Sequence, residues 1–163
     1  MEPRLITLKL FLEQLDIKLG IETVEDRKRV QKAVYLGQRT GIDLSYRFGW
    51  YLMGPYSTTL TKDYYGLAES LASINDQDTR NYQLQASIKT KLKRALPLLN
   101  PPETVSLSKE QWLELVASYD FLRHVSKQSH EDAVDILTKE KPALVRYVDQ
   151  AKKVLQQESF LSC

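Results

Sequence analysis

The sequence has little of what disulfides, metal sites and membrane spans require. Its 163 residues include one cysteine, Cys163 at the last position, and two histidines. A single cysteine excludes an intrachain disulfide and a cysteine-based zinc site, so we expect no metal and no cofactor. No apolar run approaches the ~20 residues that a membrane-spanning helix needs. The N-terminal segment carries Glu2, Lys9 and Glu13 within its apolar pattern, which argues against a signal peptide and favours a cytoplasmic location.

Catalytic motifs are equally scarce. The sequence has no glycine-rich phosphate loop, no G-x-S-x-G elbow and no H-E-x-x-H pair. Its net charge of +2 is too small to imply nucleic acid without a local concentration of cations. We therefore expect a protein that is not an enzyme. The content of 42% hydrophobic and 27% charged residues is ordinary for a globular chain, and the length suits one domain over 1–163.

The stretch 46–57 is the one around which the rest of the chain is organised. Aromatic and apolar residues alternate with others over 46–53, which predicts a strand with one apolar face. Gly54 and Pro55 are expected to end that strand, because proline cannot donate to a ladder and restricts the residue before it. Gly54 is expected in a backbone conformation that is costly for residues with a Cβ. Ser57 is expected to cap the next helix. One strand cannot stand alone, and 82–84 is the proposed partner strand.

Helical spacing of apolar residues predicts the remaining elements. The turn expected at 75–78 separates two of them. Pro97 should kink or end the helix that begins at 86. Residues 100–102, Asn-Pro-Pro, predict a stiff linker. This linker would join an N-terminal half of about 1–99 to a helical half of about 103–157. The predicted helices are 4–18, 24–39, 58–73, 86–99, one that begins after Ser108, one from Ser129 to about 138, and one that begins at Pro142. The fold class is thus a mostly helical α+β domain of six or seven helices with a small winged-helix-like strand or hairpin at 46–53.

One face of the helix 24–39 is basic. Lys28, Lys32, Tyr35 and Arg39 follow one another at helical spacing, with an aromatic residue inside the row. Such a row is either a solvated helix face or a surface that binds a phosphate backbone. In the second case, cations of a later helix would contribute to the same surface. The helping cations are Lys89, Lys93 and Arg94.

The run QKAVYLGQRTGIDLSYRFGWYLMGPYSTTLTKD, residues 31–63, resembles the YwgA-type uncharacterised proteins of bacteria and archaea. More distantly it is similar to the Panacea (SocA-like) antitoxin domain. The resemblance covers about a fifth of the chain, and Met53 departs from it where tyrosine is usual. It rests on the helix residues Gln31, Lys32, Val34 and Tyr35, and on Phe48, Trp50, Tyr51, Gly54, Pro55, Tyr56 and Ser57.

Neither family implies a reaction. The second implies binding of a partner protein, as an antitoxin or adaptor, and both have a winged-helix-like character that keeps DNA as an alternative. The main expectation is an antitoxin-like regulatory protein that binds a protein partner. Tyrosine and arginine are enriched at binding hot spots, so Arg47, Tyr51 and Tyr56 are the predicted contact residues.

A third alternative is an RNase. Arg123 and His124, followed by His130, resemble the Arg-polar-x-His signature of the helical HEPN ribonucleases. In that family the arginine and histidine act at the scissile phosphate. Ser129, however, reads as an N-cap, which would place a helix break between the two residues. The competing interpretation is that Arg123 and His124 are exposed cations at a helix C-terminus.

Overall fold

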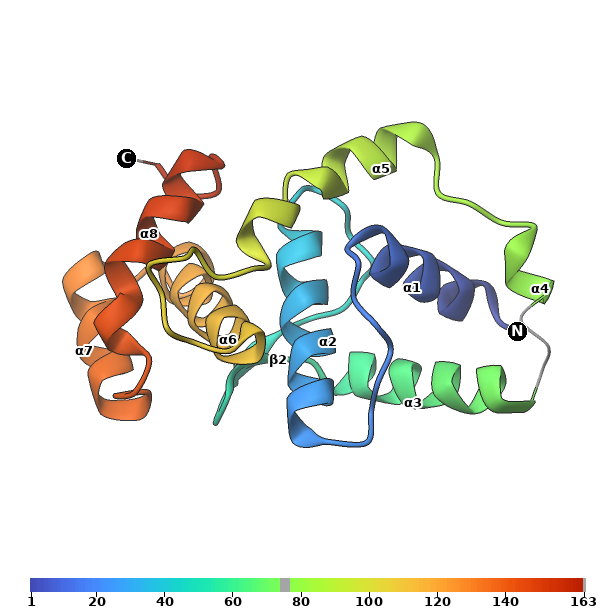
Figure 1. Ribbon diagram of the computed structural model, residues 1–163, viewed down its shortest axis with the longest axis horizontal. Helices are drawn as coiled ribbons and strands as arrows, with labels where there is room; N and C mark the ends of the chain where they lie inside the picture. The colour runs from blue at the N-terminus through green and yellow to red at the C-terminus, as the bar shows by residue number, and fades with distance from the viewer. Residues whose placement is uncertain (74–76, 163) are drawn as a thin grey trace.

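The computed structural model describes residues 1–73 and 77–162 (Figure 1). Seven helices of at least eight residues and one two-stranded hairpin make up these ranges, which confirms the mostly helical α+β class. The helices are α1 Pro3–Gln14, α2 Val24–Gln38, α3 Thr58–Ser73, α5 Ala86–Lys93, α6 Lys109–Asp120, α7 His130–Glu140 and α8 Val148–Gln157, and the strands are β1 Gly49–Tyr51 and β2 Gly54–Tyr56. A short helix, α4 Gln77–Arg80, covers part of the expected turn, while Asn75 and Asp76 lie outside the described residues.

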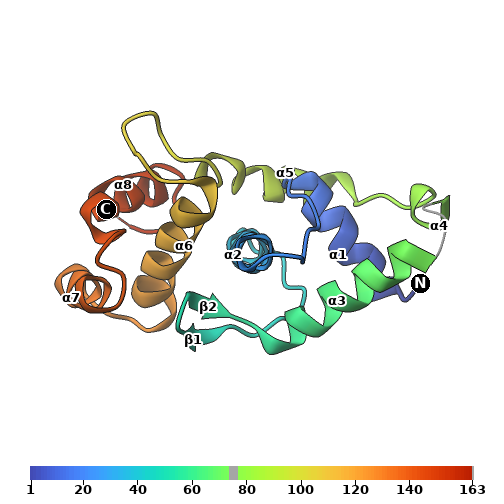
Figure 2. The same ribbon diagram turned by 60° about the horizontal axis from the view of Figure 1, so that its bottom comes forward.

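Helix α2 is the centre of the molecule (Figure 2). It packs between α1 and α6, with β2 against it as well. Residues 30–37 are buried on every side of the helix, the pattern of a core helix rather than a surface one. Its start is fixed by a reciprocal capping box, in which Thr23 Oγ1 accepts from Asp26 N and Asp26 Oδ2 accepts from Thr23 N. Gly37 allows the close approach of α1, because a Cβ there would lie 2.4 Å from Phe11 Cε1.

The hairpin differs from the expected strand. Strand β1 is antiparallel to β2, with Gly49 opposite Tyr56 and Tyr51 opposite Gly54. Gly54 and Pro55 therefore belong to the second strand and do not end the first, and the hairpin occupies 49–56 rather than 46–53. Residues 82–84 form no strand. Gly54 has a φ of +89°, which confirms the expectation of a conformation that is costly for residues with a Cβ.

Other boundaries moved by a few residues for local reasons. Helix α1 ends at Gln14, four residues before the expected end at 18, because Asp16 adopts a φ of +56°. Helix α5 ends at Lys93, before Pro97, as expected. Pro142 starts no helix; a 3-10 turn at Val145–Tyr147 precedes α8.

The two halves of the chain share one buried core. Its members run from Leu5 of α1 through α2 and α3 to Leu155 of α8. Trp112 of α6 is fully buried, and its indole N–H donates to Leu98 O at 2.9 Å. Ser108 and Gln111 form a capping box that starts α6, as the sequence predicts.

Candidate functional site

The tip of the hairpin exposes three consecutive large apolar residues. Tyr51 is 51% exposed, Leu52 88% and Met53 37%. Two-residue hairpin turns usually contain Asn, Asp or Gly, so Leu52-Met53 is a departure from ordinary turn chemistry. Departures of this kind are expected where a residue serves a function other than folding. Leu52 and Met53 were not among the predicted contact residues, although two apolar residues before Gly-Pro were the available signal.

Two buried lysines hold this tip from below. Lys141, which follows α7, donates its ammonium to Leu52 O at 3.0 Å, and Lys32 of α2 donates to Pro55 O at 2.6 Å. Gln31 closes the end of β2, because its side-chain amide donates to Ser57 O and accepts from Ser57 N, both at 2.9 Å. The exposed tip is therefore attached to a fixed base.

The base is a buried cluster of charges. Glu114 of α6 accepts from Lys28 at 2.9 Å and from Lys141 at 2.8 Å. Burial alone would raise the pKa of Glu114, yet hydrogen bonds from Lys141 and Lys28 hold it below its ordinary value. Burial pulls the pKa of Lys28 down, but its bonds to Glu114 and Glu25 outweigh burial and leave that pKa raised.

Lys32 differs from its neighbours. It is 1% exposed and, among the described residues, forms no ion pair. Burial lowers its pKa to about 7; the attraction of Glu114 opposes this shift, while repulsion from Lys141 and Lys28 adds to it. Lys32 is thus a buried amine with a single acceptor, Pro55 O.

A small cavity of about 160 Å³ opens beside Lys32, between α2, α3 and the hairpin tip. Val24, Met53 and Tyr65 stand at its mouth, and each is more than a third exposed. The cavity is lined by Val24, Arg27, Lys28, Gln31, Lys32, Met53, Tyr56, Thr61, Tyr64 and Tyr65. We call these lining residues the Lys32 pocket.

Two of the three predicted partner-contact residues meet at the hairpin. The Tyr51 and Tyr56 rings are 5.3 Å apart in an edge-to-face arrangement, and Tyr56 Oη accepts from Thr61 Oγ1 at 2.5 Å. Arg47 is exposed but does not join them. It bonds to Asp43 at 3.3 Å and lines a different cavity together with His124.

The predicted basic row on α2 is largely buried. Lys32 and Tyr35 are buried, and Lys28 is paired with Glu114. Arg39 binds both carboxylate oxygens of Asp120 at 2.7 and 3.1 Å, and Tyr35 Oη donates to Asp120 at 2.7 Å. The interpretation as a solvated face is wrong, because Glu114 and Asp120 of α6 pair with Lys28 and Arg39. The same pairs weigh against the phosphate-binding alternative.

The helping cations lie elsewhere. Lys89, Lys93 and Arg94 belong to α5 and its C-cap, and Lys93 and Arg94 are exposed. The Arg94 guanidinium lies over the Phe160 ring, 5.1 Å from its centroid. Arg94 nevertheless lies near the end of the row, because the Arg39 guanidinium is over the same ring, 5.6 Å from its centroid.

Arg123 and His130 of the ribonuclease-like pattern both contact a third residue, Tyr119. Tyr119 Oη accepts from Arg123 Nη1 at 2.7 Å and lies 2.8 Å from His130 Nδ1. Arg123 Nε also donates to Gln128 O at 3.1 Å, and Ser129 caps α7 through Asp132 N. These contacts join the end of α6 to the start of α7. His124 is exposed and stands apart from them, with a pKa that burial and the charge of Arg39 lower.

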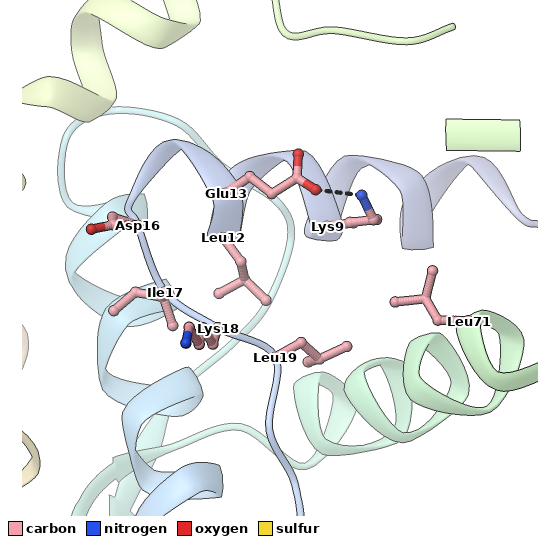
Figure 3. A pocket seen from close by; sticks show the side chains of 8 residues that line it. All are labelled: Lys9, Leu12, Glu13, Asp16, Ile17, Lys18, Leu19 and Leu71. Carbon is pink, nitrogen blue, oxygen red and sulfur yellow. Dashed lines mark hydrogen bonds and ion pairs between the residues drawn. The ribbon is translucent and has the colours of Figure 1, made fainter. Parts of the chain in front are cut away.

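A larger cavity of about 350 Å³ lies between the end of α1 and α3 (Figure 3). Its walls include Leu12, Ile17, Leu19 and Leu71, and the charged pair Lys9–Glu13 lies along one edge. Its charged lining residues are Lys9, Glu13, Asp16 and Lys18. Within the described ranges, no group of three or more potential ligands could hold a metal ion, and no helix is long and apolar enough to cross a membrane.

No family model, curated protein or solved structure matches this chain. The hairpin tip and the Lys32 pocket together form the candidate site. They combine exposed apolar side chains, a fixed base and a cationic cavity within one small area of the surface.

Proposed function

We propose that this protein is a regulatory, antitoxin-like binding protein that holds a partner protein on the surface around the hairpin tip. The observation that carries the proposal is the run of exposed Tyr51, Leu52 and Met53 on a turn anchored by Lys141 and Lys32. An apolar anchor that is already fixed loses little conformational entropy on binding, which favours affinity. Val24 and Tyr65, 46% and 44% exposed, extend the apolar area around the mouth of the Lys32 pocket.

The resemblance of residues 31–63 to partner-binding antitoxin domains supports the same proposal. A nucleic-acid function has less support, because two cations of the predicted row, Lys28 and Arg39, are paired with Glu114 and Asp120. For the ribonuclease alternative, the side chains of Arg123 and His130 are already engaged with Tyr119.

Affinity capture from the native host tests the proposal. The wild-type chain should retain a specific protein, and Leu52→Ser should weaken its binding at least about tenfold, since a hot-spot side chain contributes well over 1 kcal/mol. Tyr82→Ser is the matched control, because Tyr82 is also an exposed large side chain, at 57%, but lies outside this surface. Binding of the recovered partner to each purified variant is then measured by calorimetry.

Two results would count against the proposal. Capture of nucleic acid with no protein above background would favour the nucleic-acid alternative. Equal binding by the wild type and Leu52→Ser, with a loss in Tyr82→Ser, would place the interface elsewhere.

A further inference from the structure

The charges around the Lys32 pocket do not balance. Among its ten lining residues Arg27, Lys28 and Lys32 are cationic, and none is acidic. The charge cluster beneath the tip has three ammonium groups, on Lys28, Lys32 and Lys141, against two carboxylates, on Glu114 and the more exposed Glu25. Both carboxylates are already engaged by Lys28 or Lys141, so the ammonium of Lys32 has no counter-ion of its own.

Lys32 also has unused hydrogen-bonding capacity. An ammonium carries three donors, and Lys32 uses one of them, on Pro55 O. Gln31 is engaged, because its amide donates to Ser57 O and Thr61 Oγ1 and accepts from Ser57 N. Tyr56 Oη accepts from Thr61, so its own hydroxyl hydrogen is a second donor for an incoming group. Lys32 and Arg27 are the lining cations with unused donors, since Arg27 donates to Ile21 O and, among the described residues, forms no ion pair. Of the two, Lys32 is fully buried, so an anion bound to it would be the better shielded from water.

The size of the cavity limits what can enter. Pockets for drug-sized ligands run from about 300 to 1,000 Å³, whereas this one holds about 160 Å³. That volume suits a single side chain or a small anion. Its mouth is apolar, with Val24, Met53 and Tyr65, so a group that enters carries apolar neighbours.

We propose that the Lys32 pocket receives the carboxylate of an acidic side chain from the partner protein, while apolar residues flanking that side chain cover the hairpin tip. The proposal rests on the proposed function and adds the chemistry of the partner: an exposed Asp or Glu between hydrophobic residues. A charge-assisted bond from Lys32 would supply the missing counter-ion, and such bonds are stronger than neutral ones. The apolar rim would exclude water from that bond.

Titration of the Lys32 amine gives a test that does not need the partner. The charged groups facing it are Glu114 of α6, Lys141 after α7 and Lys28 of α2; Tyr56 and Tyr64 also line the cavity. The ammonium form binds a carboxylate and the neutral amine does not, so a bound carboxylate must raise the pKa of Lys32. At ten times its Kd the carboxylate raises the titration midpoint by about 1 pH unit.

The probe is acetate, with chloride at equal ionic strength and neutral acetamide as controls. Side-chain NMR of the lysine Cε groups in the full wild-type chain follows Lys32, and exposed Lys93 serves as the internal reference. We expect acetate to raise the Lys32 midpoint while chloride and acetamide do not, and Lys93 to stay constant. An equal Lys32 midpoint in all three solutions, up to molar acetate, would overturn the proposal.

The partner then separates the two proposals. Lys32→Met should reduce its binding at least about tenfold and remove the preference for an acidic contact residue. If Lys32→Met kept its binding while Leu52→Ser lost it, the hairpin tip would still be the partner-binding surface. The same result would overturn the proposal that a partner carboxylate enters the Lys32 pocket. Should Lys32→Met fail to fold, replacing each acidic residue of the partner by its amide gives the same comparison.

Discussion

Ser57 and Ser118 are both buried serines, with 1% and 0% of their surface exposed. Ser57 Oγ accepts from Leu60 N at 3.2 Å and so caps the first turn of α3. Ser118 Oγ is buried in α6 and has no hydrogen-bond partner among the residues that the structure describes. A buried hydroxyl without a partner has lost its bonds to water and gained nothing in return. Replacement of serine by alanine is therefore expected to lower stability at position 57 and to raise it at position 118.

Ser118→Ala should raise the free energy of unfolding by roughly 1 kcal/mol, because it removes an unsatisfied group and introduces the best helix former. Ser57→Ala should lower it by about 1 kcal/mol through loss of the cap. Urea titration with unchanged m-values measures both. A loss of stability in Ser118→Ala would mean that its hydroxyl has a partner in solution, such as a bound water.

At the scale of elements, the hairpin depends on Gly54. Its φ of +89° is unfavourable for any residue with a Cβ, and a Cβ there would lie 2.2 Å from Ser118 Oγ. Gly41 has a similar φ of +100°, but a Cβ at that position would meet no atom within 4 Å. A comparison of the same substitution at Gly41 and at Gly54 therefore separates backbone strain from steric overlap with α6.

Gly41→Ala should cost about 1 kcal/mol of stability, from the left-handed backbone alone. Gly54→Ala should cost roughly 2–3 kcal/mol, because steric overlap adds to the same strain. In the double variant Gly54→Ala with Ser118→Ala, the nearest atom of residue 118 becomes Cβ at 3.4 Å, an ordinary contact. We expect the double variant to recover the steric part, and a double-mutant cycle in urea measures it. Strictly additive losses would show that the overlap is relieved by a small shift of the hairpin.

The features predicted well are those that neighbouring residues determine. Thr23 with Asp26 and Ser108 with Gln111 start helices because side chain and backbone lie within one turn. Gly54 before a proline likewise predicts a backbone conformation that is costly for residues with a Cβ, and its φ is +89°. Each depends on a few consecutive residues, so the sequence shows it directly.

The features predicted wrongly depend on residues far apart in the chain. Lys28 and Arg39 look like an exposed row until Glu114 and Asp120, more than 80 positions later, are placed against them. The alternation over 46–53 likewise comes from two separate environments. Trp50 packs on Phe121 of the second half, whereas Leu52 turns outward at the tip. Lys141 and Glu114 were missed as parts of the site for the same reason: nothing near them in sequence indicates the hairpin.

For the whole molecule, Asp120 is the point at which three distant segments meet. Its carboxylate is fully buried and binds Arg39 and Tyr35 of α2, while Arg39 also donates to Phe160 O near the C-terminus at 2.7 Å. Burial raises the pKa of Tyr35 well above its ordinary value, and the adjacent Asp120 carboxylate adds to the shift, so the hydroxyl stays protonated as a donor. The arrangement ties both halves of the chain to one buried charge.

Asp120→Asn should lower the free energy of unfolding by roughly 3 kcal/mol, because it leaves the Arg39 charge without its partner in a buried place. Glu110→Gln is the matched control: Glu110 pairs with Arg29 across the same two helices at 2.9 Å, but both side chains are partly exposed, so its loss should cost at most about 1 kcal/mol. Since α2 and α6 share one core, unfolding followed by the methyl NMR signals of buried Leu8 in α1 and by near-ultraviolet dichroism of buried Trp112 in α6, measured in a Trp50→Phe background, should give a single midpoint. Asp120→Asn should move both midpoints equally. If it moved only the Trp112 transition, the C-terminal helices would unfold separately, and the chain would consist of two units joined at α2 and α6.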